Sequence, residues 1–254
     1  MVQLTDVISD FWKATQRGNR PPLAWSGRLS NEEGYRVQLG IADHYQASGT
    51  NRVGWKVAAT NKVVQAQLGV SEPAFGSLRD KDVLWSGGVL AIGNLAQAHV
   101  ECELCFRVNE KIATARSVAD IRAALDVVYP AFEFIEKRVP MTELALAIAD
   151  NVEHTGIVLG KPMKLQQDID FKSVVCTLTR GEEEISSANG EAVLGDPLNS
   201  ILWLKQALEK YDRALVKGDL IMTGSFVRQL PLMPGDRVRA EFTGIGSVEL
   251  SIVQ

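Results

Sequence analysis

Hydrophobic residues in the first 20 positions recur every three or four residues, which is the spacing of an amphipathic α-helix. The residues that carry this pattern are Leu4, Val7, Ile8, Phe11 and Trp12. Pro21 and Pro22 interrupt the pattern. A second helix is predicted to begin near Ser30, where Glu33 is placed to complete a capping box. Residues 1–50 are therefore expected to form a helical N-terminal portion.

After residue 51 the pattern changes to short runs of strand formers separated by turn residues. Strands are predicted over residues 52–58, 83–92, 100–108, 132–139, 157–159, 174–180, 183–188, 219–224 and within 237–253. Helices are predicted over residues 61–68, 117–128 and 197–208, the last with Asp196 as N-cap and Pro197 at its first position. Because the strands are grouped and most helical residues come early, we expect an α+β fold and one catalytic domain over residues 1–254.

The composition is that of an ordinary globular protein, with 46% hydrophobic and 23% charged residues. A net charge of -4, with no run of Lys and Arg, argues against nucleic acid as a partner. We expect no membrane span, since no segment has about 18 uninterrupted apolar residues, and no signal peptide. Three cysteines, Cys102, Cys105 and Cys176, complete no zinc site and are interpreted as reduced core residues of a cytoplasmic protein.

The stretch HVECELCF places Glu101 and Glu103 two residues apart in a run of strand formers. Side chains alternate along a strand, so both carboxylates share one face with His99 and Cys105. At roughly 7 Å, their repulsion is about 0.6 kcal/mol in water and about 2.4 kcal/mol at an effective dielectric of 20. An ordinary strand with a solvated face tolerates such a pair, whereas a buried face requires a cation or a proton.

Glu133 is a third carboxylate in an apolar setting, between two phenylalanines in the run PAFEF. If it converged with the first two, the three charges would repel by several kcal/mol at the same dielectric, so a bound cation would be needed. Carboxylate oxygens alone suit a hard ion, Mg²⁺ or Mn²⁺, which keeps open positions for water and substrate. Glu101, Glu103 and Glu133 are therefore the candidate metal ligands.

Lys56, in the run GWKVAAT, offers a charge of the opposite sign. One interpretation is a desolvated lysine whose ammonium is aimed at an anionic substrate. The other is a lysine whose stem packs on Trp55 while its head stays in water.

Seven segments occur in an order and spacing that resembles one branch of the fumarylacetoacetate hydrolase superfamily. They are GWKVAATNKVVQAQLGVSEPAFGSL, VECELCF, PAFEF, the Asp150-Asn151 pair before Gly156, LGDPLNSILWL, GDLIMTGSF and GDRVRAEFTGIGSVELSI. The branch contains 2-keto-4-pentenoate hydratases and 2-oxo-3-hexenedioate (4-oxalocrotonate) decarboxylases. The similarity runs from about residue 30 to the C-terminus.

The resemblance implies a mixed β-roll or sandwich of the fumarylacetoacetase C-terminal type, and a site for Mg²⁺ or Mn²⁺. It also implies a homo-oligomer and association with a related hydratase or decarboxylase. The metal-binding E-x-E of the family matches Glu101 and Glu103, its later single glutamate matches Glu133, and its active-site lysine matches Lys56.

Members of this branch act on small 2-oxo or 2-hydroxy-dienoic acids made when aromatic rings are cleaved. The first hypothesis is a metal-dependent hydratase (a lyase) of the 2-keto-4-pentenoate type, with 2-oxo-3-hexenedioate decarboxylase as the alternative. Two further alternatives are an acylpyruvate C–C hydrolase and an inert scaffold subunit, although the intact set of three glutamates and one lysine argues against inertness.

One position departs from the hydratase pattern. Hydratases of this branch have an acidic residue in the stretch matching residues 73–76, and this chain has Ala74. Related decarboxylases can carry an apolar residue at this position, so Ala74 favours either decarboxylation or a different base for hydration. The candidates for such a base are Glu72, Asp80, Glu153 and His154. Ser225, Arg228 and Asn151 are candidate substrate contacts, with a solvated loop as the alternative for Arg228.

Overall fold

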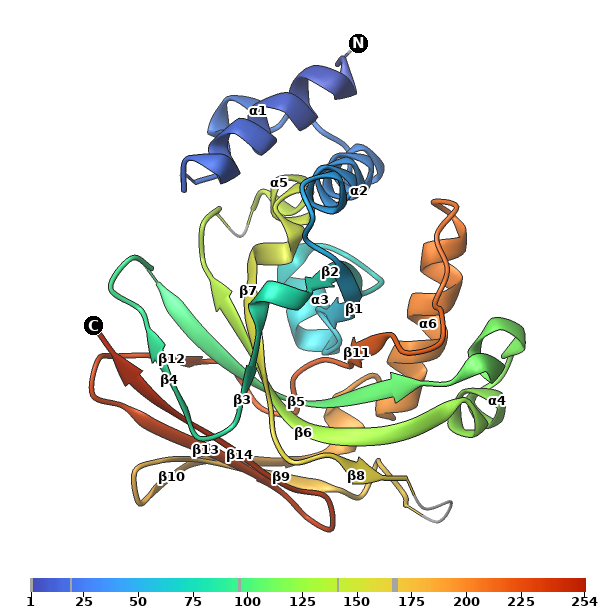
Figure 1. Cartoon of the computed structure of the whole chain (residues 1–254), viewed down its shortest axis with the longest axis vertical. Helices are drawn as coiled ribbons and strands as arrows, with labels where there is room; N and C mark the ends of the chain where they lie inside the picture. The colour runs from blue at the N-terminus through green and yellow to red at the C-terminus, as the bar shows by residue number, and fades with distance from the viewer. Residues whose placement is uncertain (1, 19, 96, 141, 166–168) are drawn as a thin grey trace.

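Two β-sheets and a group of helices at one end make up the fold of this computed structural model (Figure 1). The structure describes residues 2–18, 20–95, 97–140, 142–165 and 169–254. About one third of the chain is helical and about one third is strand, and the α+β class predicted from the sequence is confirmed. Among the described residues, the helices are all too short or too polar to cross a bilayer.

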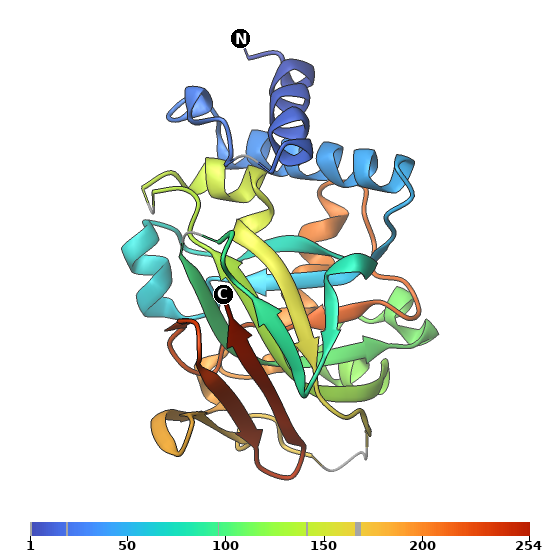
Figure 2. The ribbon, with the colours of Figure 1, turned by 60° about the vertical axis from the view of Figure 1, so that its left-hand side comes forward.

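The N-terminal portion is helical, as predicted. Helix α1 spans Leu4–Gln16, and helix α2 spans Asn31–Ala47 behind a complete Ser30–Glu33 capping box. Both lie at one end of the molecule beside α5 (Leu144–Ala149), which the sequence did not predict (Figures 1 and 2). Helix α2 packs closely on α5 because residue 34 is glycine: a Cβ there would lie 2.5 Å from the Ala145 carbonyl oxygen.

The larger sheet has nine strands. Its main path runs β2 (Ala74–Arg79), β1 (Arg52–Ala58), β11 (Leu220–Met222), β5 (Ala98–Val108), β6 (Leu125–Glu136), β7 (His154–Leu159) and β3 (Val83–Trp85). The short strands β12 (Leu230–Pro231) and β8 (Met163–Lys164) pair with β5 and β6. The sheet curls until β2 lies against β7, so its concave side is enclosed by its own strands.

The smaller sheet has five strands and lies at the opposite end from α1 (Figure 1). Its order is β10 (Glu183–Asn189), β9 (Val175–Arg180), β13 (Arg237–Phe242), β14 (Gly246–Val253) and β4 (Gly88–Ala91). The remaining α-helices are α3 (Lys62–Leu68), α4 (Val118–Ala123) and α6 (Pro197–Glu209). Short 3-10 segments span Leu23–Trp25, Asp80–Asp82, Glu110–Thr114, Asn151–Glu153 and Gly190–Ala192.

Strands β5 and β6 separate two apolar clusters. One face of each strand packs into the main core against α6 and the smaller sheet; Leu104, Phe106 and Phe132 are on this face. The other face lines the concave side of the curled sheet, where Cys105 and Ala131 pack with Leu78 of β2 and Ile157 of β7. The carboxylates predicted to bind metal belong to this second face.

Most predicted elements are present, with local corrections. The predicted strand 132–139 is β6, which begins earlier, at Leu125, and ends at Glu136. The predicted helix 117–128 is wrong beyond Ala123, because residues from Leu125 onward form β6 and pair with β5. The predicted strand 83–92 is two strands, since Gly87 has a φ of +85° and turns the chain between β3 and β4. Strand β2 was not predicted, because its sequence AFGSLR has no clear alternation.

Candidate metal centre

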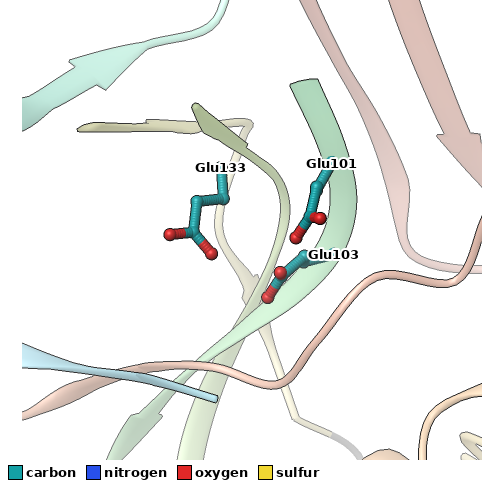
Figure 3. Close-up of side chains that lie close together, drawn as sticks. All are labelled: Glu101, Glu103 and Glu133. Atoms are coloured by element: carbon teal, nitrogen blue, oxygen red, sulfur yellow. The ribbon is translucent and has the colours of Figure 1, made fainter. Parts of the chain in front are cut away.

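Three glutamates converge on the concave face of the curled sheet. Glu101 and Glu103 come from β5, and Glu133 comes from β6 directly opposite Glu101 in the antiparallel register (Figure 3). One carboxylate oxygen from each lies within 4.8 Å of the other two. Glu103 and Glu133 are fully buried and Glu101 is partly buried, so the interpretation of this segment as a solvated strand face is wrong.

Burial makes the ionised forms of these carboxyl groups unfavourable in the absence of a cation. Burial, followed by the charge of Glu133, raises the pKa of Glu101 to about 7. Burial, followed by the charges of Glu133 and Glu101, raises the pKa of Glu103 well above its ordinary value. Without a cation, protons therefore neutralise part of the cluster.

Glu133 behaves differently because it has cationic and hydrogen-bonding partners. Burial acts to raise its pKa, but Lys56 and the hydrogen bond from His154 outweigh burial and lower the pKa. Lys56 Nζ lies 3.1 Å from Glu133 Oε1, and His154 Nδ1 lies 2.7 Å from the same oxygen. Glu133 is thus the ionised member of the cluster.

Lys56 is buried inside the protein, and its ammonium is held by two oxygen atoms. Its exposed fraction is 1%, which excludes the alternative of a stem on Trp55 with a solvated head. Besides Glu133, its Nζ donates a hydrogen bond of 2.9 Å to the carbonyl oxygen of Val152. Of the two interpretations left open by the sequence, the desolvated lysine is therefore the one that the structure supports, and contact of its ammonium with a substrate stays a prediction.

His154 is neutral in this setting. Burial lowers the pKa of its imidazole below the ordinary value, although Glu133 opposes the shift. A neutral ring that donates from Nδ1 to Glu133 has a lone pair on Nε2, and Nε2 has no hydrogen-bond partner among the described residues. His154 can therefore accept a proton at Nε2.

Unpartnered oxygens show that the three carboxylates fit a divalent cation. Among the described residues, Glu103 Oε1 and Glu133 Oε2 are buried and lack any hydrogen-bond partner. The other oxygen of Glu103, Oε2, accepts a hydrogen bond of 2.8 Å from the backbone N–H of Gly224, which fixes its direction. Buried carboxylate oxygens are rarely left unpartnered in proteins, and an all-oxygen donor set is what Mg²⁺ and Mn²⁺ prefer.

A cavity of about 720 Å³ is lined in part by Thr60, and none of the three glutamates is among its lining residues. Thr60 packs directly against Gly224, since a Cβ at Gly224 would lie 2.3 Å from Thr60 Oγ1. The N–H of Gly224 binds Glu103, so Gly224 connects the wall of this cavity to the carboxylate cluster. Lys62, Glu72 and Asn199 line the same cavity. Its volume suits a small organic acid.

A second cavity of about 510 Å³ lies between the helical end and β7. His154, Asn151 and Arg138 are among its lining residues. His154 thus lies between this cavity and the carboxylate cluster.

The other predicted site residues lie outside the carboxylate cluster. Glu72 is exposed at the first cavity, with its carboxylate 3.9 Å from Lys210. The hydroxyl of Ser225 donates to the Val227 carbonyl and accepts from Cys102 N–H, and Arg228 is exposed. Asn151 uses its side-chain amide to bind the backbone of Ser77 rather than pointing it at the cluster.

The site also contains groups that the sequence did not reveal. Two of them are backbone groups, the N–H of Gly224 and the carbonyl of Val152, and the third is the side chain of Thr60. Backbone groups leave no side-chain signature, although Gly224 has a φ of +105°, which is why a glycine is required there.

Comparisons with known proteins agree with this geometry. The model of the fumarylacetoacetate (FAA) hydrolase C-terminal family matches residues 35–253. The chain is 33% identical to 2-keto-4-pentenoate hydratase 1 of Dechloromonas aromatica over 251 residues, covering 96% of this chain and 95% of that protein. It is 29% identical to 4-oxalocrotonate decarboxylase of Pseudomonas putida, covering 87% and 85% of the two chains.

A solved structure is similar over the whole chain. It is 4-oxalocrotonate decarboxylase from Pseudomonas putida G7, in a complex with magnesium and adipate. The TM-score is 0.89 at 25% identity, and the alignment covers 100% of this chain and 99% of that one.

Proposed function

Since the chain belongs to the fumarylacetoacetate hydrolase C-terminal family, we propose that it is a divalent-metal-dependent hydratase. Its substrate in this proposal is a small 2-hydroxy-2,4-dienoate of the 2-keto-4-pentenoate pathway type, and the product is the corresponding 4-hydroxy-2-oxo acid. The similarity to 2-keto-4-pentenoate hydratases over most of both chains supports this choice.

The observation that carries the proposal is the buried cluster of Glu101, Glu103 and Glu133 beside Lys56. Three carboxylates with two unpartnered oxygens would hold Mg²⁺, or Mn²⁺ in its place. When bound, such an ion supplies Lewis-acid stabilisation of negative charge on a substrate oxygen.

The protein's own groups then have separate roles. The ammonium of Lys56 binds the substrate carboxylate or transfers protons to and from the dienol, because it is the cationic side chain adjoining the carboxylate cluster. A proton added at C5 of the dienol gives the conjugated 2-oxo-3-enoate, and water then adds at C4.

His154 is the best candidate for activating that water. It is neutral, and its Nε2 is free to accept a proton. Glu153 is less suitable, because its carboxylate accepts hydrogen bonds from the backbone N–H groups of Arg138 and Val139. Glu72 is exposed and faces Lys210.

Decarboxylation of 2-oxo-3-hexenedioate is the second candidate function, and two observations favour it. The family resemblance leads us to expect an acidic residue in a hydratase where this chain has Ala74, and the likeness to the decarboxylase structure covers the whole chain. Both reactions use stabilisation of negative charge on the 2-oxo oxygen, so the same carboxylate cluster serves either.

One experiment separates the two candidates. The protein is incubated with Mg²⁺ and either 2-hydroxypenta-2,4-dienoate or 2-oxo-3-hexenedioate, while dienol absorbance and CO₂ release are followed. We expect Mg²⁺-dependent consumption of the first substrate. Release of CO₂ from the second with no consumption of the first would instead establish the decarboxylase, and turnover of neither would refute both.

A further inference from the structure

The segment between α5 and β7 has an unusual backbone. Asn151, Val152 and Glu153 are three consecutive non-glycine residues with φ of +56°, +50° and +59°. Left-handed conformation costs roughly 1–2 kcal/mol per L-residue, and it is least favourable for a β-branched residue such as valine. Such a turn persists only where the surrounding structure holds it.

Side-chain hydrogen bonds hold this turn from both sides. On one side, Asn151 pairs with the backbone of Ser77 in β2, accepting from its N–H at 2.7 Å and donating to its carbonyl at 2.9 Å. On the other side, Glu153 Oε1 accepts from the N–H groups of Arg138 and Val139 at 2.6 and 2.9 Å. These two anchors fix the carbonyl of the residue between them.

That carbonyl belongs to Val152, and it accepts the hydrogen bond from Lys56 Nζ. The turn also packs directly on the lysine stem. A Cβ at Gly76, which lies opposite Lys56 in β2, would be 2.9 Å from Asn151 Oδ1 and 3.0 Å from Lys56 Cε. The ammonium therefore has two fixed acceptors, Glu133 on the sheet and Val152 on the turn.

We propose that Asn151 and Glu153 are positioning residues, which hold the left-handed turn so that the Val152 carbonyl fixes the Lys56 ammonium in its productive place. This inference rests on the proposed function for the role of Lys56. It gives Asn151 a different role from the substrate contact expected from the sequence. It also explains why Glu153, although acidic and near the site, is not the base.

The test uses four variants of the full-length protein with Mg²⁺ and 2-hydroxypenta-2,4-dienoate. In Asn151→Ala both hydrogen bonds to β2 are lost, and we expect kcat to fall by about 10- to 100-fold, since a misplacement of about 1 Å costs this much. Ser77→Ala is the matched control, because it removes only the long 3.4 Å bond from Ser77 Oγ to Asn151 Oδ1 and keeps both backbone bonds. We expect its kcat to lie within about two-fold of the wild type.

Two variants at Glu153 keep the proposal testable if Asn151→Ala folds poorly. Glu153→Ala removes the acceptor for Arg138 and Val139, whereas Glu153→Gln keeps a side-chain carbonyl in the same place. We expect Glu153→Ala to lose kcat and Glu153→Gln to restore most of it. In every variant the Mg²⁺ dissociation constant, measured by calorimetry, should stay within about two-fold, because Glu101, Glu103 and Glu133 are unchanged.

A structural measurement separates failure of this inference from failure of the proposed function. In a crystal structure of Asn151→Ala we expect Lys56 Nζ to lie beyond about 3.5 Å from the Val152 carbonyl oxygen, whichever reaction the enzyme catalyses. An unchanged Lys56 position, or a wild-type kcat in both Asn151→Ala and Glu153→Ala, would overturn the inference. Loss of activity together with loss of Mg²⁺ binding would also overturn it, by showing a general disruption of the site.

Discussion

Glu133 Oε1 accepts from both Lys56 Nζ and His154 Nδ1, at 3.1 and 2.7 Å, while within the described part of the chain Glu103 accepts only from the backbone N–H of Gly224. The two buried carboxylates are therefore in opposite states when no metal is bound. Glu133 is ionised and compensated, and its pKa is lowered, whereas the pKa of Glu103 is raised. A divalent cation would complete the compensation of the whole cluster, and the following predictions depend on this asymmetry.

We expect Glu103→Gln to lower Mg²⁺-dependent turnover by about 100-fold or more and to leave the fold intact. The amide oxygen of glutamine can still accept from Gly224 N–H, and the substitution replaces an acid whose ionised form Glu101 and Glu133 would repel by a neutral group of the same shape. The measurements are turnover with Mg²⁺ and the metal-free Tm, which should be equal to or above that of the wild type. Full activity of the variant in the presence of a chelator would refute the metal assignment.

Mg²⁺ should stabilise the protein more strongly as the pH rises from about 5 to 8. In the metal-free folded state the pKa of Glu101 is about 7 and that of Glu103 is raised. In the unfolded chain both carboxyl groups have their ordinary, lower pKa. Between these pKa values the folded protein holds protons that the unfolded chain has already released. Metal-free stability consequently falls as the pH rises through this window, while Glu133, with its lowered pKa, stays ionised throughout. Metal ligation requires the deprotonated forms.

The check is the Mg²⁺-induced rise in Tm, measured at pH 6 and at pH 8. We expect the larger rise at pH 8, and only a small rise at either pH in Glu103→Gln. If the Mg²⁺-induced rise in Tm of the wild type were the same at both pH values, protons and Mg²⁺ would not compete for these carboxylates.

The convergence of the carboxylates was predictable from the sequence, but the contact between Lys56 and Glu133 was not. Alternation along one strand places Glu101 and Glu103 together, and this is a local property. Lys56, in contrast, is on β1, which β11 and β5 separate from β6, and it meets Glu133 only because the larger sheet curls. Curling depends on contacts between distant strands, which a single sequence does not display.

The left-handed turn was equally inaccessible from the sequence. Glycine and asparagine are the usual signals for positive φ, and Val152 is neither of these. The turn is stabilised by partners far along the chain, the backbone of Ser77 among them. The acidic and histidine residues in this segment suggested several possible bases, and only the contacts of Glu153 and His154 distinguish them.

We expect Lys56→Met to have opposite effects on turnover and on metal binding. Turnover should fall by about 100-fold or more, because the ammonium that binds the substrate or transfers protons is gone. The Mg²⁺ affinity should rise, because a buried positive charge 3.1 Å from a ligand oxygen is removed. Without metal, Glu133 loses its buried partner, so the free energy of unfolding should fall by about 3–5 kcal/mol.

Calorimetric Mg²⁺ titration and denaturant unfolding with and without Mg²⁺ test these effects. Lys217→Met is the control, because that lysine pairs with Glu110 at the surface and both side chains are exposed. Its change in unfolding free energy should stay within about 0.5 kcal/mol. Wild-type turnover in Lys56→Met would contradict the role given to this lysine.

Ala74→Asp should shift the balance between the two candidate reactions toward hydration. Ala74 is the first residue of β2 and packs at the edge of the main apolar cluster, two residues before Gly76, which is paired with Lys56. A carboxylate there would supply the acid or base that this chain lacks relative to hydratases of its branch. Positioned general acids and bases contribute about 100-fold or more, so even a partly aligned aspartate should raise the ratio of hydration to decarboxylation about 10-fold.

Ala74→Asn is the matched control, because it has nearly the same shape and cannot exchange a proton. Both variants bury a polar group at a position that is 4% exposed, so both should lose about 1–3 kcal/mol of stability. Only the aspartate should change the ratio of dienol consumption to CO₂ release. An equal ratio in the two variants would show that position 74 does not control the choice of reaction, and the water-activating role would remain with His154.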